Sequence, residues 1–180
     1  MSMGVSADGF INDRSGRFDW SPPIDGLIRF QHEQVGLLGG YLLGRRLYET
    51  MQVWETDASM RDTEAGAAFA EVWAALPKVV FSHTLDRVQG NARLARASVA
   101  EEVAAALDST DKDVSIGGPT LAGQAYDLDL VDEARVFRYP VVVGGGTPYF
   151  APVTQQLALD LAETRIFGSQ VIYERYRRTR

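Results

Sequence analysis

The sequence predicts an α/β fold in which a mostly parallel central sheet carries helices on both faces and ends in an antiparallel C-terminal edge. Three observations predict it. Short β-branched runs alternate with amphipathic stretches along most of the 180 residues, which is the pattern of parallel β–α–β units. The last three runs follow one another without helices between them, so they should pair antiparallel. The chain is 46% hydrophobic, enough for one continuous core, so we expect a single domain over residues 1–180.

The expected strands are runs rich in Val, Ile, Leu and aromatic residues. In chain order they cover residues 41–43, 79–82, 114–116, 134–143, 157–164 and 171–176. The expected helices lie between them. One apolar stripe covers residues 24–38, a second runs from Ala65 to Leu76 and stops at Pro77, and a third follows the capping pair Ser98 and Glu101 and ends near Leu107.

Composition argues against several function classes. The chain has no cysteine and two histidines, so disulfides and thiolate metal sites are excluded and we expect no metal centre. Its net charge of -6 argues against nucleic-acid binding, which needs a basic face. The N-terminus lacks a secretory signal, and no window approaches the roughly 20 apolar residues that span a bilayer. We therefore expect a cytoplasmic protein that contacts neither nucleic acid nor membrane.

Two strand ends are typical of phosphate sites. In the first, an apolar strand runs into Gly117 and Gly118, and Pro119, Thr120 and Leu121 then open a helix. Such a turn lets backbone approach a ligand, and the helix start offers free N–H groups to an anion. A tight turn without a ligand explains the same pattern, and the third glycine of a dinucleotide-binding GxGxxG is missing.

The second strand end places Gly44, Arg45 and Arg46 at the start of a helix. Two arginines there oppose the helix dipole unless an anion lies between them. A further strand ends at Ser82 and His83, and α/β folds bind ligands at the carboxyl ends of their strands. For His83 a surface loop position remains an alternative to phosphate recognition.

At these residues the sequence resembles a known family. The strings LLGRRLYE, VVFSHTL, VSIGGPTLAG, VDEARVFRYPVVVGGG and ETRIFGSQVIYERY together resemble the dihydrofolate reductase-like family, which includes the riboflavin-pathway reductase domain. The resemblance implies a three-layer fold that binds NADPH. The cofactor residues that it implies are Gly44, Arg45, Arg46, Ser82, His83, Gly117, Gly118, Pro119, Thr120 and Leu121. Many relatives carry arginine in place of His83, which would weaken the preference for NADPH over NADH.

Two carboxylates are candidates for catalysis. Reduction of a C=N bond needs a protonated acceptor nitrogen. In dihydrofolate reductases the acid follows a Trp-x-x-Pro-x-acid pattern, and Trp20 to Asp25 reproduces that spacing. Asp25 binds the substrate or supplies the proton, or it only caps a helix. Asp8 is the other contender, because the family's first loop lies beside the nicotinamide, although its Asp-Gly pair is also typical of a plain turn.

The substrate is expected to be a small heterocycle. Riboflavin-pathway enzymes place lysine where this chain has Phe10, which favours a flatter, more apolar ring such as a pterin. Phe10 and Trp20 would line its pocket, although aromatic residues are also common in cores. An aminopyrimidine reductase of the riboflavin pathway and a non-catalytic NADPH-binding module remain alternatives. The apolar strands at the C-terminal edge, from Ala134 onward, predict a homodimer.

Overall fold

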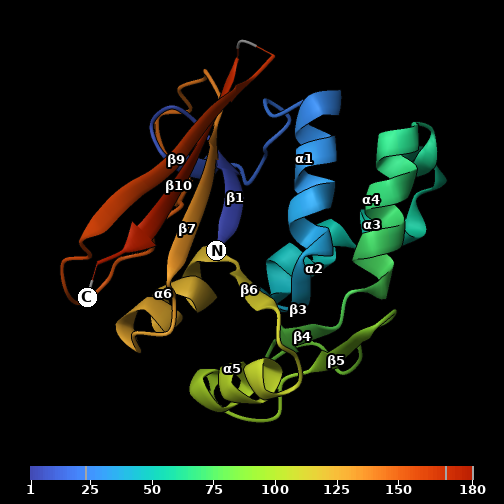
Figure 1. Ribbon diagram of the computed structural model, residues 1–180, viewed down its shortest axis with the longest axis vertical. Helices are drawn as coiled ribbons and strands as arrows, with labels where there is room; N and C mark the ends of the chain where they lie inside the picture. Colours follow the sequence, from blue (N-terminus) through green and yellow to red (C-terminus); the bar gives the residue numbers. More distant parts are fainter. Residues whose placement is uncertain (23, 169, 180) are drawn as a thin grey trace. The chain divides into compact units, whose positions relative to one another are not determined.

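The computed structural model describes residues 1–22, 24–168 and 170–179. The chain divides into two compact units (Figure 1). The central unit consists of residues 25–121, and the terminal unit of residues 1–24 and 122–180.

The central unit is built on a parallel sheet with the strand order β5-β4-β3-β6. Its strands are β3 (Leu38–Gly44), β4 (Lys78–Phe81), β5 (Ala92–Leu94) and β6 (Asp113–Gly117). Its helices are α1 (Asp25–Gly36), α2 (Arg45–Met51), α3 (Val53–Thr56), η1 (Ala58–Arg61), α4 (Glu64–Ala75) and α5 (Val99–Asp108). A last helix, α6 (Pro119–Asp127), begins in this unit and continues into the terminal unit.

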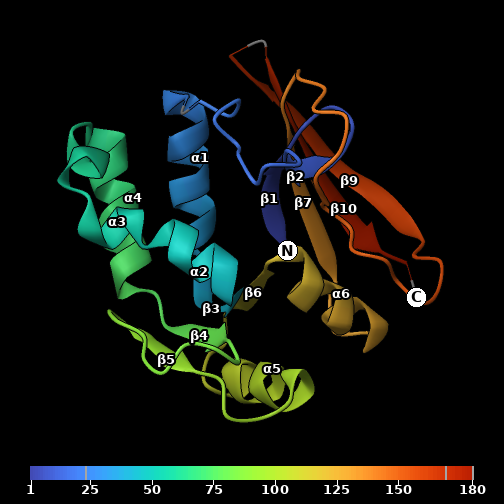
Figure 2. The ribbon, with the colours of Figure 1, turned by 180° about the vertical axis from the view of Figure 1, so that it is seen from behind.

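Helices cover both faces of the parallel sheet. Side chains alternate between the faces of a strand, so Leu43 and Val80 point to one face and Leu42 and Val79 to the other. The first face packs with Phe69, Trp73 and other residues of α4 and α1 in one hydrophobic core, and Figure 2 shows these two helices side by side. The second face is covered by α5. The expected α/β class with helices on both faces is confirmed.

The helix boundaries follow capping chemistry. Ser98 and Glu101 form the predicted capping box at the start of α5. The next residue, Glu102, is buried and accepts hydrogen bonds from the Arg93 guanidinium and from the backbone N–H groups of Arg96 and Ala97. This carboxylate therefore holds the connection between β5 and α5.

The terminal unit contains a mixed sheet with the order β1-β7-β10-β9 and a two-stranded sheet of β2 and β8. Their bounds are β1 (Ser2–Val5), β2 (Phe10–Asn12), β7 (Glu133–Arg138), β8 (Thr147–Pro148), β9 (Leu159–Phe167) and β10 (Val171–Arg178). The pairs β7–β10 and β10–β9 are antiparallel, as predicted, whereas β1 pairs parallel with β7.

Two details of the terminal unit differ from expectation. β7 ends at Arg138 rather than at residue 143, because Pro140 cannot donate to a ladder and the chain turns there through a Val141 N–H bond to the Tyr139 carbonyl. β7 also lies inside the sheet, between β1 and β10. The antiparallel edge is therefore β9, not the run that begins at Ala134.

Candidate cofactor and catalytic site

The predicted cofactor residues gather at one edge of the central sheet. β3, β4 and β6 are parallel neighbours, so their carboxyl ends lie side by side. Gly44 ends β3, Ser82 follows β4, and Gly117 ends β6. The structure thus places these strand ends at the edge where α/β sheets bind ligands.

Gly44 and Gly118 form a close approach of two backbones. Gly118 has φ +95°, a conformation that favours glycine, and a Cβ added to it would lie 3.6 Å from the Gly44 N and Cα atoms. A Cβ on Gly44 would lie 3.7 Å from the Gly117 carbonyl oxygen. The two turns therefore present backbone rather than side chains at this strand end, and we call the pair of turns the glycine cradle.

Gly117 has a different explanation. A Cβ there would collide with the side chains of Leu47 and Tyr41, and Tyr41 belongs to the hydrophobic core. Packing alone therefore requires glycine at this position. Of the glycine pair, Gly118 is the one whose conformation serves the cradle.

Helix α6 starts next to the cradle. Pro119 is its first residue, as predicted, and the helix runs for nine residues. Thr120 is exposed at this start, whereas Leu121 is buried. The first N–H groups of a helix have no partner within it, so this end of α6 can bind an anion.

The two arginines of α2 differ in their partners. The Arg45 Nη1 atom bonds both carboxylate oxygens of Glu49, at 3.0 and 3.1 Å. Arg46 is exposed and has no ion pair within the described part of the chain. The sequence reading did not single out Glu49, although the i,i+4 spacing of arginine and glutamate is a known signal.

The connection after β4 is held against α2. The Ser82 Oγ atom accepts the N–H groups of Thr84 and Leu85, at 3.1 and 3.0 Å, which makes a tight turn, and His83 is exposed at its tip. Farther along, the Gln89 N–H donates to the buried Tyr48 hydroxyl at 2.8 Å. Tyr48 thus fixes the loop that begins at Ser82 to the helix that begins at Arg45.

The two candidate carboxylates lie in different units. Asp25 is the first residue of α1 in the central unit, and its side chain lies outside the described residues. Asp8 lies in the terminal unit, where its carboxylate accepts the N–H groups of Gly144 and Val143 at 2.8 and 3.2 Å. Together with the Ser6 hydroxyl, the largest cause, these bonds hold the pKa of Asp8 below its ordinary value.

The glycine run beyond Asp8 is conformationally demanding. Gly144, Gly145 and Gly146 have φ values of +70°, +137° and +145°, and the Arg14 Nη2 atom donates to the Gly144 carbonyl at 2.6 Å. A Cβ on Gly146 would collide with the Asn12 carbonyl oxygen. Asp8 and Arg14 therefore hold a loop that only glycine can form.

The two candidate substrate aromatics both lie in the terminal unit. Phe10 is half-buried in β2, where it pairs with Pro148 of β8. Trp20 makes an edge-to-face contact with Tyr139, with ring centroids 5.8 Å apart. Its indole Nε1 atom is buried without a hydrogen-bond partner among the described residues, which is unusual for a buried donor.

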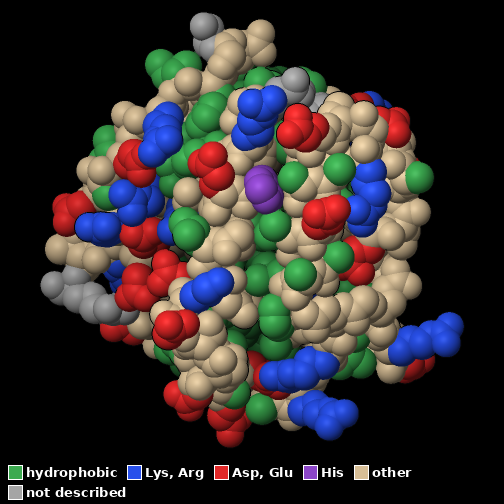
Figure 3. All heavy atoms as spheres, turned by 45° about the vertical axis from the view of Figure 1, so that its right-hand side comes forward, with side chains coloured by type: hydrophobic (Ala, Val, Ile, Leu, Met, Phe, Trp, Pro, Cys, Tyr) green, Lys and Arg blue, Asp and Glu red, His purple; other side chains and the backbone are tan. Residues whose placement is uncertain are grey.

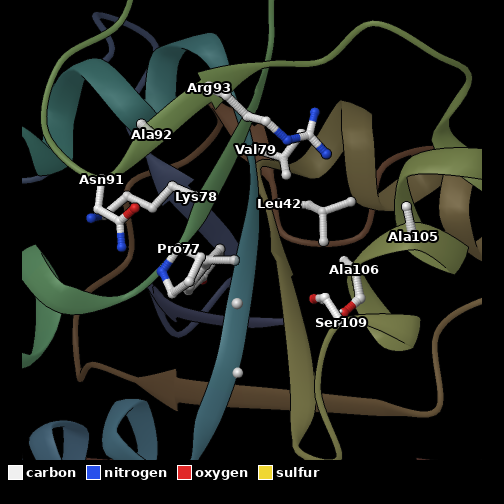
Figure 4. Close-up of a pocket in the computed structure, with 13 residues that line it drawn as sticks. Leu42, Pro77, Lys78, Val79, Asn91, Ala92, Arg93, Ala105, Ala106 and Ser109 are labelled. Atoms are coloured by element: carbon white, nitrogen blue, oxygen red, sulfur yellow. Dashed lines mark hydrogen bonds between the residues drawn. The ribbon is translucent and has the colours of Figure 1, made fainter.

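A pocket of about 300 Å³ lies at the opposite end of the parallel strands, between the starts of β3 and β4 and helix α5 (Figure 4). Leu42 and Val79 face Ala106 across it. The polar groups around it already have partners. Lys78 pairs with Glu55 at 3.2 Å, Arg93 with Glu102, the Asn91 amide bonds the Ala75 carbonyl, and Ser109 bonds the Ala106 carbonyl. None of the predicted site residues lines this pocket.

On the face drawn in Figure 3, basic and acidic side chains are interspersed and form no patch of a single charge. The C-terminal arginines are also engaged. Arg175 and Arg177 both pair with Glu133, at 3.3 and 3.2 Å. Over residues 1–22, 24–168 and 170–179, no three potential ligand side chains cluster to hold a metal ion. In the same residues no helix is long and apolar enough to cross a membrane.

Comparison with known proteins decides the family. The model of the RibD C-terminal domain matches residues 1–173. The chain belongs to the RibD C-terminal domain family. The uncharacterized protein YyaP of Bacillus subtilis is 30% identical over 178 residues, which cover 96% of this chain and 90% of that protein.

Solved structures agree with this family on the fold. A candidate riboflavin biosynthesis protein from Shewanella sp. PV-4 has a TM-score of 0.79 and 21% identity, over 99% of this chain and 97% of that chain. The dihydrofolate reductase of Enterococcus faecalis, solved with NADP(H) and RAB-propyl, has a TM-score of 0.63 and 17% identity, over 99% of this chain and 94% of that chain. This RibD C-terminal domain protein therefore has the dihydrofolate reductase-like fold that the sequence motifs predicted.

Proposed function

We propose that this protein is a reductase that transfers hydride from NADPH to a small conjugated heterocycle such as a pterin. One observation carries the proposal: the glycine cradle and the arginines lie at one edge of the parallel sheet. Membership of the RibD C-terminal domain family supports it. The Enterococcus dihydrofolate reductase, which shares the fold, was solved with NADP(H).

We propose that the cradle binds the pyrophosphate side of a dinucleotide. Gly44 and Gly118 present backbone rather than side chains, and the start of α6 would hold the pyrophosphate. Arg45 and Arg46, with Ser82 and His83 after the neighbouring strand, would hold the 2′-phosphate through charge-assisted bonds. Each of these residues belongs to the central unit.

The reduction needs a hydride and a proton. NADPH, when bound, supplies the hydride. The proton must reach the nitrogen of the reduced C=N bond, which a carboxylic acid can supply if it is protonated near the working pH. We propose Asp25 for this role. Asp8 is less suited to donate a proton, because its bonds to Ser6, Gly144 and Val143 favour the ionised form.

Phe10 and Trp20 are the proposed substrate contacts. The Trp20 indole N–H has no hydrogen-bond partner among the described residues, and we propose that it donates to an acceptor atom of the heterocycle. An aminopyrimidine of the riboflavin pathway is the second candidate substrate, favoured by the family and by the Shewanella relative. Phe10 counts against it, because the lysine expected for a ribityl phosphate is absent there.

Turnover tests the proposal against its alternatives. Oxidation of NADPH is followed with pterins, aminopyrimidines and quinoid compounds, and controls omit either substrate or protein. We expect oxidation with a pterin. Preferential oxidation with an aminopyrimidine would indicate an aminopyrimidine reductase of the riboflavin pathway. NADPH binding without turnover would indicate a non-catalytic NADPH-binding module.

A homodimer is part of the same proposal. β9 is one of the two edge strands of its sheet, and Ile166 of β9 pairs in register with Ile172 of β10. Their exposed fractions are 71% and 40%. Exposed apolar side chains beside an unpaired edge favour association with a second copy.

A further inference from the structure

The ion pair between Arg45 and Glu49 bears on cofactor choice. Both side chains lie on α2 and are about two-fifths exposed, at 39% and 41%. Glu49 places one negative charge beside the two positive charges of Arg45 and Arg46. We infer that Glu49 is a specificity-determining residue that lowers the preference for a 2′-phosphorylated cofactor. This inference rests on the proposed function.

The geometry leaves room for a phosphate and the carboxylate together. Glu49 contacts only the Nη1 atom of Arg45, and the Nε and Nη2 atoms have no hydrogen-bond partner among the described residues. A phosphate can therefore bind the free edge of the guanidinium without displacing Glu49. The carboxylate then stays close to a group that carries about -1.5 to -2 charges near neutral pH, so the two repel.

A cofactor without the 2′-phosphate does not meet this repulsion. A ribose 2′-hydroxyl can donate a hydrogen bond to a carboxylate, which is how acidic residues favour NADH in other dinucleotide sites. Removal of the negative charge from Glu49 should thus strengthen binding of the 2′-phosphorylated ligand and leave the other nearly unchanged.

The opposite possibility is that Glu49 orients Arg45 for the phosphate. An exposed i,i+4 pair contributes little to holding a side chain in place. Loss of the repulsion should therefore outweigh loss of the orientation. The sign of the change in affinity decides between the two.

The test compares the wild-type protein with Glu49→Gln, a change that keeps the size of the side chain. Calorimetry measures binding of 2′,5′-ADP and 5′-ADP, which differ in the 2′-phosphate, and of NADPH and NADH. We expect Glu49→Gln to bind 2′,5′-ADP and NADPH roughly three- to tenfold more tightly. Binding of 5′-ADP and NADH should change by less than about twofold.

Glu71→Gln is the matched control. Glu71 is an exposed carboxylate on α4, so the variant has the same net charge as Glu49→Gln, and its affinities should equal those of the wild type. Unchanged or weaker NADPH binding by Glu49→Gln, or an equal gain for both cofactors, would overturn the inference about Glu49 but not the proposed function. If the wild-type protein bound none of the four ligands, the proposed function would fail and the inference with it.

Discussion

Asp8 shows what a residue's local sequence can and cannot reveal. The Asp-Gly pair correctly signals a turn, and Gly9 has φ +88°. The bonds that Asp8 makes to Val143 and Gly144 join residues 135 and 136 positions apart. No local sequence pattern indicates such contacts. The sequence alone therefore did not decide whether Asp8 is a catalytic residue or part of a plain turn.

The carboxylate of Asp8 should stabilise the 143–146 loop in a pH-dependent way. Because folding lowers its pKa, the contribution is present above the unfolded pKa of about 3.9 and is lost as pH falls through the folded value. We expect Asp8→Asn to speed amide exchange at Val143 and Gly144 near neutral pH, with wild type and variant converging in acid. Asp19→Asn, which removes an exposed pair with Arg17, is the control. Equal exchange in all three proteins would contradict the assignment.

Arg45 is the residue on which we expect 2′-phosphate recognition to depend most directly. Arg45→Ala removes a charge-assisted bond and leaves Glu49 unpaired, so it should weaken NADPH more than NADH by roughly 1.5–3 kcal/mol. Calorimetry at moderate salt measures the difference. Arg61→Ala removes an exposed charge elsewhere in the central unit and should leave both affinities unchanged. An equal loss for both cofactors would mean that Arg45 contacts the pyrophosphate or lies outside the cofactor site.

The elements of the central unit followed their sequence signals closely. Strand β6, its glycine pair and a helix beginning at Pro119 all appear as expected. The apolar run, the two glycines and the proline each favour their local conformation without help from distant residues. The sequence did not separate the roles of the two glycines, since the collision at Gly117 involves Leu47 and Tyr41 from other elements. The short strands β2, β5 and β8 also went unpredicted, because two or three residues carry no readable period.

A side chain at Gly118, in the turn between β6 and α6, should impair cofactor binding without unfolding the protein. Gly118→Val adds a branched side chain to the cradle at a positive φ, and the strain costs about 1–2 kcal/mol. We expect a folded protein that no longer binds NADPH, as measured by circular dichroism and calorimetry. Gly16→Val imposes similar strain at φ +79° with no neighbour within 4 Å, and should keep NADPH affinity. Normal binding by Gly118→Val would make the turn purely structural.

At the scale of the whole molecule, the sequence at the borders of the two compact units resembles that of ordinary turns between elements. They meet along the chain at residues 24–25 and 121–122, and the second point lies inside α6. Pro22 and Pro23 precede the first border, and Gly118, Pro119 and Gly123 flank the second. Each is as typical of a turn or a helix start as of a domain border, so no linker contradicted the expectation of one domain. The C-terminal antiparallel order was readable, but the identity of the edge strand depended on long-range pairing.

The exposed residues Ile166 and Ile172 at the β9 edge predict that the protein is a homodimer. Sedimentation at micromolar concentration should give a species near twice the 19.8 kDa of one chain. Ile166→Lys should shift it toward the monomer, because a charge in an apolar interface is costly. Leu37→Lys changes an equally exposed side chain, at 65%, in the central unit and should leave the dimer intact. A wild-type monomer that persists on concentration would rule out this surface as a dimer interface.

The central claim is that the carboxyl edge of the parallel sheet binds NADPH. Calorimetric titration of the wild-type protein with NADPH and with NADH at moderate salt tests it most directly. The arginines and the glycine cradle predict one NADPH per chain and an affinity at least several-fold above that for NADH. Absence of NADPH binding, or equal affinities for the two cofactors, would contradict it.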